Sequence, residues 1–477
     1  MTCLIGVFVL IPALLFGGGL YRIDPPGGLS VEEVPLFVSF GWDDNAYADG
    51  VEWVLDYTRD MRNYDGSAVR GTFFITTNFA TPGGELNNQT PEGVKNAWLQ
   101  AYAEGNEIAN HTEAHERFVS NKGVDYWLEA IGNANSFIVN EMGIPHDSIM
   151  GFRTPFLEYG DGTMEALEKL GFRYDCSVEC GFDYYSIRPG EQTDTGWVDY
   201  AYSPGRARGG KLHWWPYTMD AGVPEGTNYR ASRGVEGMWQ IPVNVYQKPP
   251  VDFTDFNAIP DDLEVSTVTG FDFNIWNSID TREEVLQLLK FVFHQRLQGN
   301  RSPLTINVHS DYYSIHNTGV NDPDSRDYFT VPLEERKAVL EEFTEYITTF
   351  QEVRVVPYAT LVDWLENPVP LSDYRAPNRF GLAENGETNS VRDMETQQPR
   401  IPHITVSGTE LHLRVEESAA YGVDIFTPQG QLVHTVHRGV LDRGLQRFCL
   451  NNLDMGRGHY IIRVQGEETV RTLLFVQ

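Results

Sequence analysis

Basic residues and cysteines are scarce in this chain of 477 residues. Only 36 Lys and Arg stand against 67 Asp and Glu, which gives a formal net charge of -31 at pH 7. A charge of this sign repels phosphate backbones and anionic lipid headgroups, so nucleic acid is not an expected partner. Four cysteines are too few for a disulfide framework. The pair in CSVEC, Cys176 and Cys180, permits a local bridge or two free thiols, and no further Cys or His beside it supports a zinc knuckle.

Charge is also absent from the N-terminus, where residues 4–20 form an apolar run that is interrupted by Pro12 and ends in a glycine run. This run is short for a membrane span and typical of the apolar part of a secretory signal. We therefore predict that residues 1–22 are a signal peptide, with an uncleaved anchor as the alternative. The protein is then expected to be secreted or held at the cell surface.

Short apolar runs alternate with amphipathic segments from residue 36 to about residue 365. The apolar runs predict strands at 36–42, 70–75, 107–111, 149–153, 172–178, 238–245, 303–309 and 353–358. The amphipathic segments predict helices near 90–104, 125–141, 163–170, 281–297 and 332–349. Such alternation is typical of a parallel α/β sheet or barrel, and we predict a distorted (β/α) barrel as a catalytic domain over residues 30–366.

Three further stretches depart from this alternation. Residues 180–235 are rich in Gly, Pro and aromatic residues without a clear period, which predicts a long loop near the site. Residues 367–402 are rich in Pro, Asn and Glu, which predicts a linker. Residues 403–477 alternate apolar and polar positions between Gly and Asn turns, which predicts a small all-β sandwich domain.

Charged side chains stand where several of the predicted strands end. They are Asp43 and Asp44, His111 and His115, Arg153, and His309. Because the carboxyl ends of the strands of an α/β barrel gather on one face, these side chains are expected to form one site. Two histidines four residues apart can converge on one metal ion. The zinc-protease motif HExxH is excluded, since Glu113 stands one place too late for it.

In their order along the chain, these motifs resemble those of the polysaccharide deacetylase family of carbohydrate esterases. The family has a strand-ending Asp-Asp, His-(Ser/Thr)-x-x-His, Arg-x-Pro-(Tyr/Phe) and a late strand-ending His. This chain has WDD at 42–44, HTEAH at 111–115, RTPF at 153–156 and VH at 308–309. Within residues 36–365, the segments GFRTPFLEYGDG, FRYDCS, WPYTMD and NRSPLTINVH are similar to chitin deacetylases of the animal type.

Two departures from the family pattern are visible. The first motif is usually Thr-Phe-Asp-Asp-Gly, whereas here Gly41, Trp42 and Asn45 surround the two aspartates. The Asp-x-x-Asp-Trp motif of bacterial peptidoglycan deacetylases is absent from the sequence. Asp175 in RYDCS is the best match to the corresponding strand end.

The resemblance implies a metal site with a carboxylate and two imidazoles as ligands. Asp44, His111 and His115 would bind Zn²⁺, or Co²⁺ or another divalent metal in its place, and leave positions open for water and a substrate oxygen. The metal would act as a Lewis acid on the acetamide carbonyl.

The resemblance also implies the groups that handle protons. Asp43 would be the general base, held ionised and oriented by Arg153. His309 would protonate the departing nitrogen, with Asp175 as its charged partner. The backbone N–H of Phe156 would be the oxyanion donor.

Aromatic side chains near these motifs are candidates for contact with sugar rings. Trp42, Trp214, Trp215 and Tyr312 would offer flat apolar faces, with core packing as the alternative for each. Asp220 and Asp311 are rivals of Asp175, although loop capping is the expected role of both.

The resemblance predicts a secreted metal-dependent hydrolase that removes N-acetyl groups from N-acetylglucosamine polymers, with chitin as the first candidate partner. The alternatives are a deacetylase of peptidoglycan, acetylxylan or small amides, and an inactive polysaccharide-binding protein on the same fold. The C-terminal module, with GHYIIRV and a terminal apolar strand, is similar to the sorting domains of the type IX secretion route. That similarity implies the secretion machinery as a partner, and a carbohydrate-binding domain is the competing interpretation.

Overall fold

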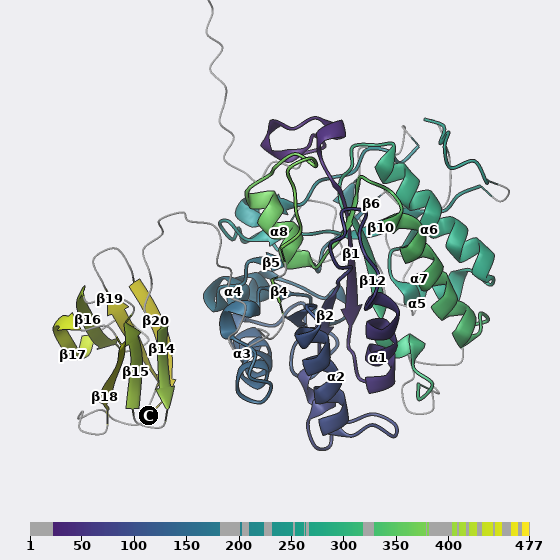
Figure 1. Cartoon of the computed structure of the whole chain (residues 1–477). Coiled ribbons are helices and arrows are strands. Elements are labelled where there is room, and N and C mark those ends of the chain that lie inside the picture. The colour runs from purple at the N-terminus through teal and green to yellow at the C-terminus, as the bar shows by residue number, and fades with distance from the viewer. Residues whose placement is uncertain are drawn as a thin grey trace, which may run out of the picture. The chain divides into compact units, whose positions relative to one another are not determined.

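The computed structural model describes residues 22–181, 201–202, 209–223, 231–250, 253–261, 263, 267–317, 329–377 and 379–380 of the N-terminal part. In the C-terminal part it describes the strands given below and residue 450. The chain divides into two compact units, Met1–Ser390 and Val391–Gln477 (Figure 1). The predicted signal or anchor lies outside the described residues except for Arg22. Among the residues that are described, none of the helices is long and apolar enough to cross a membrane.

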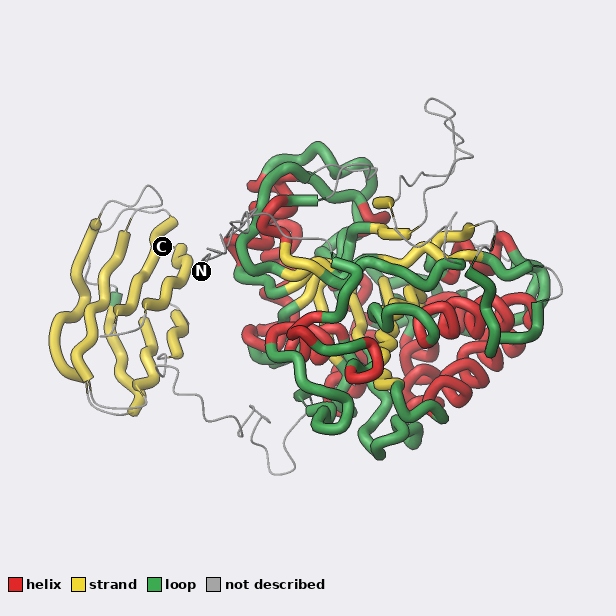
Figure 2. The backbone as a smooth tube through the Cα atoms, turned by 90° about the horizontal axis from the view of Figure 1, so that it is seen from above, coloured by secondary structure: helices red, strands yellow, loops and turns green. Residues whose placement is uncertain are grey.

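The first unit is built on a nine-stranded sheet with the order β12-β1-β2-β3-β4-β5-β9-β8, and β13 also pairs with β1. Its strands are β1 (Leu36–Asp43), β2 (Thr72–Ile75), β3 (Glu107–Asn110), β4 (Gly151–Phe152), β5 (Tyr174–Asp175), β8 (Tyr217–Thr218), β9 (Trp239–Gln240), β12 (Leu304–His309) and β13 (Val353–Val355). All pairs are parallel except that of β8 with β9. The sheet is curled, and Figure 2 shows the helices arranged around its strands.

Helices connect the parallel strands and cover them. They are α1 (Ala48–Thr58), α2 (Pro91–Ala103), α3 (Val124–Asn140), α4 (Asp161–Leu170), α5 (Asp272–Ser278), α6 (Arg282–Leu297), α7 (Leu333–Thr348) and α8 (Tyr358–Glu366). Every residue of β1 is buried, as expected for a strand of a parallel sheet that is covered on both faces. Of these helices, α1, α5 and α8 were not predicted from the sequence.

The predicted barrel is not closed by a backbone ladder in the part that the structure describes. A second sheet, with the order β11-β10-β6-β7, consists of β6 (Glu179–Gly181), β7 (Ala201–Tyr202), β10 (Val243–Gln247) and β11 (Thr267–Thr269). Its β10 lies beside β12 through two mutual bonds: the Asn244 N–H donates to Thr305 Oγ1 (3.1 Å), and the Thr305 N–H donates to Asn244 Oδ1 (2.9 Å). The result is a curled half-barrel.

One predicted strand, 238–245, is two strands in different sheets. Pro242 separates β9 from β10. Because proline has no N–H to give to a ladder, the chain leaves the main sheet at this point and joins the second sheet.

The linker predicted at 367–402 begins too early. Tyr374 and Phe380 are buried in the core of the first unit, and the ring of Tyr374 packs edge-on against Phe37 at a centroid distance of 5.3 Å. The Pro-rich composition of this stretch therefore gave no sign that two of its aromatic side chains pack into the core. The first unit extends at least to Phe380.

The second unit contains two antiparallel sheets. One consists of β14 (His403–Ser407), β15 (Glu410–Val415) and β18 (Gly444–Cys449). The other has the order β17-β16-β19-β20, with β16 (Ala419–Phe426), β17 (Leu432–Leu441), β19 (His459–Gln465) and β20 (Val470–Val476). Leu411 and Leu413 of β15 share a small buried core with Val423 of β16 and Ile462 of β19. The assignment of this unit as a sorting or carbohydrate-binding domain stays a prediction.

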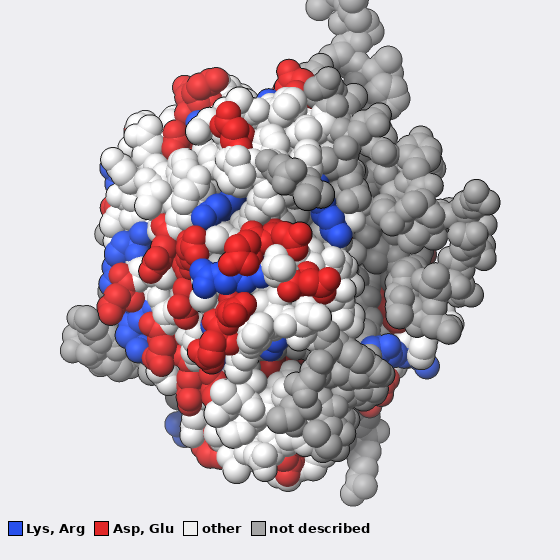
Figure 3. All heavy atoms as spheres, turned by 90° about the vertical axis from the view of Figure 1, so that its right-hand side faces the viewer, with Lys and Arg blue, Asp and Glu red and all other residues white. Residues whose placement is uncertain are grey.

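Acidic side chains are mixed with basic ones on the face of the first unit that carries α6 and α7 (Figure 3). Arg282 and Lys290 of α6 both pair with Glu342 of α7, at 2.8 and 3.2 Å. Exposed pairs of this kind contribute only about 0–1 kcal/mol each to stability. The excess of acidic residues therefore affects which partners the protein can bind more than it affects the stability of the fold.

Candidate functional site

The parallel register brings the predicted site residues to one edge of the main sheet. Asp43, the last residue of β1, is paired directly with His309, the last residue of β12. Asn110 at the end of β3 is paired with Phe152 at the end of β4. The residues that follow these strand ends therefore face a common space, as the sequence predicts.

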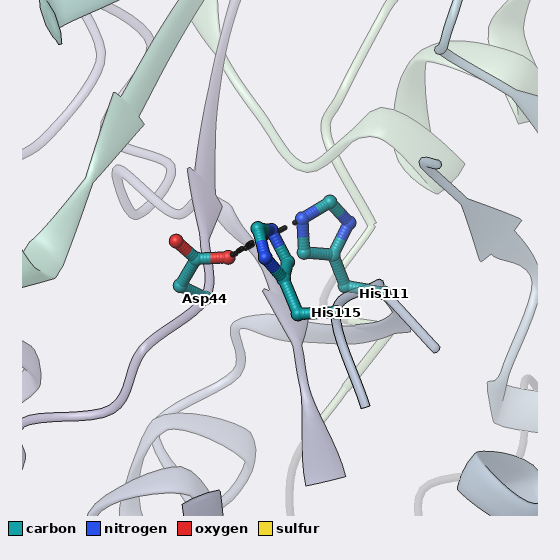
Figure 4. Close-up of side chains that lie close together, drawn as sticks. All are labelled: Asp44, His111 and His115. Carbon is teal, nitrogen blue, oxygen red and sulfur yellow. Dashed lines mark ion pairs between the residues drawn. The ribbon is translucent and has the colours of Figure 1, made fainter. Parts of the chain in front are cut away.

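Asp44, His111 and His115 converge at this edge (Figure 4). Asp44 Oδ1 lies 2.9 Å from His115 Nε2 and 3.4 Å from His111 Nε2. One ligand atom from each of the three residues lies within 4.8 Å of the others. Burial would raise the pKa of the Asp44 carboxyl, but the His115 and His111 imidazoles hold it well below its usual range.

The chemistry of these three groups fits a divalent cation. His111 Nδ1 lies 2.7 Å from the backbone oxygen of Arg153, which only accepts, so Nδ1 carries the proton and Nε2 presents a lone pair. Within the described structure, Asp44 Oδ1 is buried and has no hydrogen-bond partner apart from the two imidazoles. A buried carboxylate oxygen that lies beside the Nε2 atoms of two histidines is the arrangement expected of a zinc site of the Asp-His-His type.

The turn that carries Asp44 is held by Asn45. Both residues have positive φ, 66° and 64°, in the left-handed region that Asn tolerates better than most residues. The Asn45 amide donates to the backbone oxygens of Trp42 (2.8 Å) and Phe74 (3.0 Å), and its Oδ1 accepts from Ser310 Oγ (2.9 Å). Asn45 therefore fills the usual glycine position of the motif and also ties β1 to β2 and to the end of β12.

Asp311 holds the next part of the same loop. Its Oδ1 accepts the N–H groups of Ala46 (2.8 Å) and Tyr47 (3.3 Å) just before α1. Asp220 likewise accepts the Gly237 N–H (2.8 Å). The predicted loop-capping role of both aspartates is confirmed.

Arg153 is fully buried, and its guanidinium donates hydrogen bonds to several acceptors. Its Nη1 donates to Asp43 Oδ1 (2.6 Å), its Nη2 to Asn307 Oδ1 (2.8 Å) and the Tyr358 hydroxyl (3.1 Å), and its Nε to the backbone oxygen of Cys176 (3.1 Å). Burial opposes the charge, but Asp43 holds the pKa of Arg153 well above its ordinary value. Arg153 thus fixes the position of the Asp43 carboxylate.

The departure from the family motif at Gly41 has a structural reason. A Cβ at this position would lie 3.0 Å from Arg153 Nη1 and 3.1 Å from the Phe74 ring. The lack of a side chain at Gly41 therefore lets the guanidinium lie directly against β1.

His309 is bound by Asp272, whereas the sequence assigned Asp175 to it. His309 Nδ1 lies 2.7 Å from Asp272 Oδ1, and the His309 N–H donates to Asp272 Oδ2 (2.9 Å). Asp175 instead accepts from the Ser177 hydroxyl (2.6 Å) and the Ser177 N–H (3.0 Å). Burial opposes the charge of His309, but Asp272 raises the pKa of His309 to about 10. Burial raises the pKa of Asp175 to about 6.

This difference predicts that two single variants will behave differently: Asp272→Asn should shift the pH profile and Asp175→Asn should not. Because Asp272 keeps the His309 imidazole protonated, Asp272→Asn should move the alkaline limb of kcat/KM to lower pH by about 1–3 units, the usual effect of losing a close opposite charge. The raised pKa of about 10 also means that the contribution of His309 to stability is complete below about pH 6.5 and is lost as pH rises toward 10. In Asp272→Asn, this pH-dependent loss of stability should be smaller. Measuring the free energy of unfolding as a function of pH would detect the difference.

Asp175→Asn is the matched control, since it makes the same change at the aspartate that the sequence favoured. It should leave the alkaline limb in place because Asp175 bonds to Ser177. If the alkaline limb of kcat/KM moves in Asp175→Asn and stays in place in Asp272→Asn, Asp272 is not the partner that keeps His309 protonated.

Two of the four aromatic side chains predicted to contact sugar are core residues. Trp42 is 1% exposed and packs edge-on against Tyr313 at 6.1 Å. Trp215 is fully buried and stacks on Trp364 at 6.0 Å. Neither indole can meet a substrate in this structure, so the sugar-contact interpretation is wrong for both residues and the alternative of core packing holds.

Other aromatic rings do lie beside the site. The half-buried ring of Tyr312 lies 4.8 Å from the His309 ring. Trp214 is half-buried as well, but its carbonyl accepts from Ser302 Oγ (2.6 Å) just before β12 begins, at the end of that strand away from His309. Phe156 is 38% exposed, and its ring lies 4.5 Å from that of His115. Phe156 has a φ of 53° within a short 3-10 turn, Pro155–Leu157, and the role of its N–H as an oxyanion donor stays a prediction.

Cys176 and Cys180 are both free and buried. The alternative of a local bridge in CSVEC is thus not realised. Burial raises the pKa of Cys180 to about 12 and that of Cys176 well above its usual value, so both thiols stay protonated and unreactive.

Residues 47–174 match the family model of polysaccharide deacetylase. The match supports a polysaccharide deacetylase domain in this chain. It includes the two histidines and Arg153, and it ends before His309 and begins after the Asp43–Asp44 pair.

Two curated relatives are chitin deacetylases of Bombyx mori. Chitin deacetylase 8 is 22% identical over 364 residues, which cover 73% of this chain and 75% of that protein. Chitin deacetylase 1 is 20% identical over 348 residues, which cover 72% of this chain and 53% of that protein.

Similar solved structures include two family 4 carbohydrate esterases. The enzyme from Streptomyces lividans, in complex with acetate, is 18% identical, with 30% of this chain and 64% of that chain covered at a TM-score of 0.23. The enzyme from Bacillus anthracis is 17% identical, with 36% and 80% covered at a TM-score of 0.24.

Proposed function

We propose that this protein is a secreted, metal-dependent hydrolase that removes N-acetyl groups from N-acetylglucosamine polymers, with chitin as the preferred class. The observation that carries the proposal is the convergence of Asp44, His111 and His115 beside an Arg-bound Asp43 and an Asp-bound His309. The resemblance to chitin deacetylases at low identity supports the choice of polymer.

A divalent metal, Zn²⁺ in the first place, would be held by Asp44, His111 and His115 and would supply Lewis acidity toward the acetamide carbonyl. His111 is fixed for this role by its bond to the Arg153 carbonyl, which aims Nε2 at Asp44. These three residues would therefore bind the metal ion and hold it in place.

Proton transfer falls to the two strand-end residues that are paired in register. Asp43, oriented by the Arg153 guanidinium, would take the proton of the attacking water. His309, kept protonated by Asp272, would give a proton to the departing amine nitrogen. Tyr312 beside His309 and Phe156 beside His115 would offer apolar faces to the sugar rings.

Secretion, and a role of the second unit in sorting through the type IX route or in carbohydrate binding, belong to the same proposal. Their support is the apolar run at residues 4–20 and the strand pattern of residues 403–477. Both features suit an enzyme whose substrate is an extracellular polymer.

The proposal is tested by offering the purified full chain chitin oligomers, peptidoglycan and acetylxylan in parallel and measuring released acetate. We expect release from chitin oligomers that a chelator abolishes and added Zn²⁺ restores, because the site depends on a divalent cation. Release from acetylxylan alone would redirect the substrate assignment. Stoichiometric metal without acetate from any substrate would instead favour an inactive polysaccharide-binding protein.

A further inference from the structure

A cavity of about 390 Å³ lies far from the metal site, and arginines line it. On its wall, Arg70 stands two residues before β2 and Glu104 three residues before β3, while Asp44 and His111 follow the carboxyl ends of β1 and β3. The cavity and the metal site are therefore at opposite ends of the same parallel strands. Its volume is in the lower part of the range of small-molecule pockets.

Three arginines, Arg62, Arg70 and Arg379, line this cavity, and Glu104 is the single carboxylate among the described lining residues. This is the reverse of the balance in the whole chain, which carries a formal net charge of -31. Glu104 is itself occupied, since its Oε1 accepts from Arg59 (3.1 Å) and from Gln100 (2.9 Å). Arg379 is also paired, with Asp363, so the positive charge that faces the cavity comes from Arg62 and Arg70.

Two of these arginines are anchored by backbone oxygens. Arg62 Nη1 donates to the backbone oxygens of Arg59 (2.9 Å) and Met61 (2.7 Å). Arg70 donates from Nη1 to the backbone oxygen of Val69 (2.7 Å) and from Nε to that of Glu104. Within the described residues neither arginine pairs with a carboxylate, so each guanidinium keeps N–H groups available for a ligand.

The arginines also repel one another. Burial and the neighbouring Arg62 charge hold the pKa of Arg70 below its usual range, and the Glu104 carboxylate only partly offsets this. An anion in the cavity would remove that repulsion and pair with two guanidinium forks at once, which is the strongest common mode of oxyanion recognition.

We propose that this cavity is a binding site for a phosphate group, held by Arg62 and Arg70 with Arg379 beside them. The proposal is independent of the hydrolase site at the other end of the strands. The phosphate could be free inorganic phosphate or the monoester of a saccharide, and the cavity has room for the latter.

The test is isothermal titration of the full chain with inorganic phosphate and with glucose 6-phosphate, at constant ionic strength maintained with NaCl. Saturable binding is expected, and tighter binding of glucose 6-phosphate would identify the monoester as the source. Arg62→Gln and Arg70→Gln should each weaken the binding about tenfold or more, as expected for the loss of a hydrogen bond between charged groups. Glu104→Gln should strengthen it by removing the lining carboxylate.

Arg282→Gln is the matched control, since it makes the same change in charge at a surface arginine that pairs with Glu342. Arg62 is exposed, so Arg62→Gln should fold normally even if the partly buried Arg70 variant does not. The proposal is overturned if neither ligand binds saturably at millimolar concentration. It is equally overturned if Arg282→Gln weakens binding as much as Arg62→Gln does.

Discussion

Replacement of Asp44 by Asn should lower the affinity for divalent metal by more than about 100-fold, beyond the range of about 10–100-fold for residues that only support metal ligands. The reason is that Asp44 supplies the negative charge of the site and lies within 3.4 Å of both histidine Nε2 atoms. Acetate release should fall to background with it. Metal content after dialysis, measured by mass spectrometry, and acetate release from chitin oligomers check the two parts separately.

Glu113→Gln is the matched control for this prediction. Glu113 stands between the two histidines in the sequence, yet its Oε2 accepts from Asn133 Nδ2 (2.8 Å). The control variant should therefore keep its metal and its activity. An Asp44→Asn protein that retains one tightly bound metal would show that Asp44 is not a ligand.

Replacement of Arg153 by Met should destabilise the first unit by about 3–5 kcal/mol, the cost of breaking a buried ion pair by removing one partner. Met fills a similar volume, but it leaves the Asp43 carboxylate buried at 3% exposure and without its guanidinium. Asn307, Tyr358 and the Cys176 oxygen lose a donor as well. Denaturant unfolding of the full chain, compared with the parent protein, measures the change.

A double variant separates the ion pair from simple loss of packing. Adding Asp43→Asn to Arg153→Met removes the stranded charge, so the double variant should be less destabilised than the sum of the single variants. Arg62→Met, at an exposed arginine, should change stability by less than about 0.5 kcal/mol. Additive effects of the two buried changes would contradict the coupling of Asp43 and Arg153.

The predicted site residues that lie together in the structure share one property: each follows an apolar run closely. Asp43, Asp44, His111, Arg153 and His309 lie at or just after strand ends, and the parallel sheet then brings them together without knowledge of any loop. Asp272 has no such signal. It begins α5 after the short strand β11, and only the approach of Phe271 to Asn307 brings it to His309.

The errors among the aromatic residues have two different physical causes. Trp42 directly precedes Asp43 in β1, and neighbouring strand residues point to opposite faces, so a strand that aims Asp43 into the site aims Trp42 away from it. That error was avoidable from the sequence. Trp215 belongs to a stretch without periodicity, where nothing in the local pattern reports that its ring meets Trp364.

The pairing of Asp43 with His309 across β1 and β12 has an evolutionary consequence. Their separation is set by main-chain geometry, so point mutations elsewhere cannot tune it gradually, and a slip of a single residue would turn one of them toward the opposite face. Divergence among such proteins in what they bind should therefore accumulate in the segments between strands, while these two positions change together or not at all.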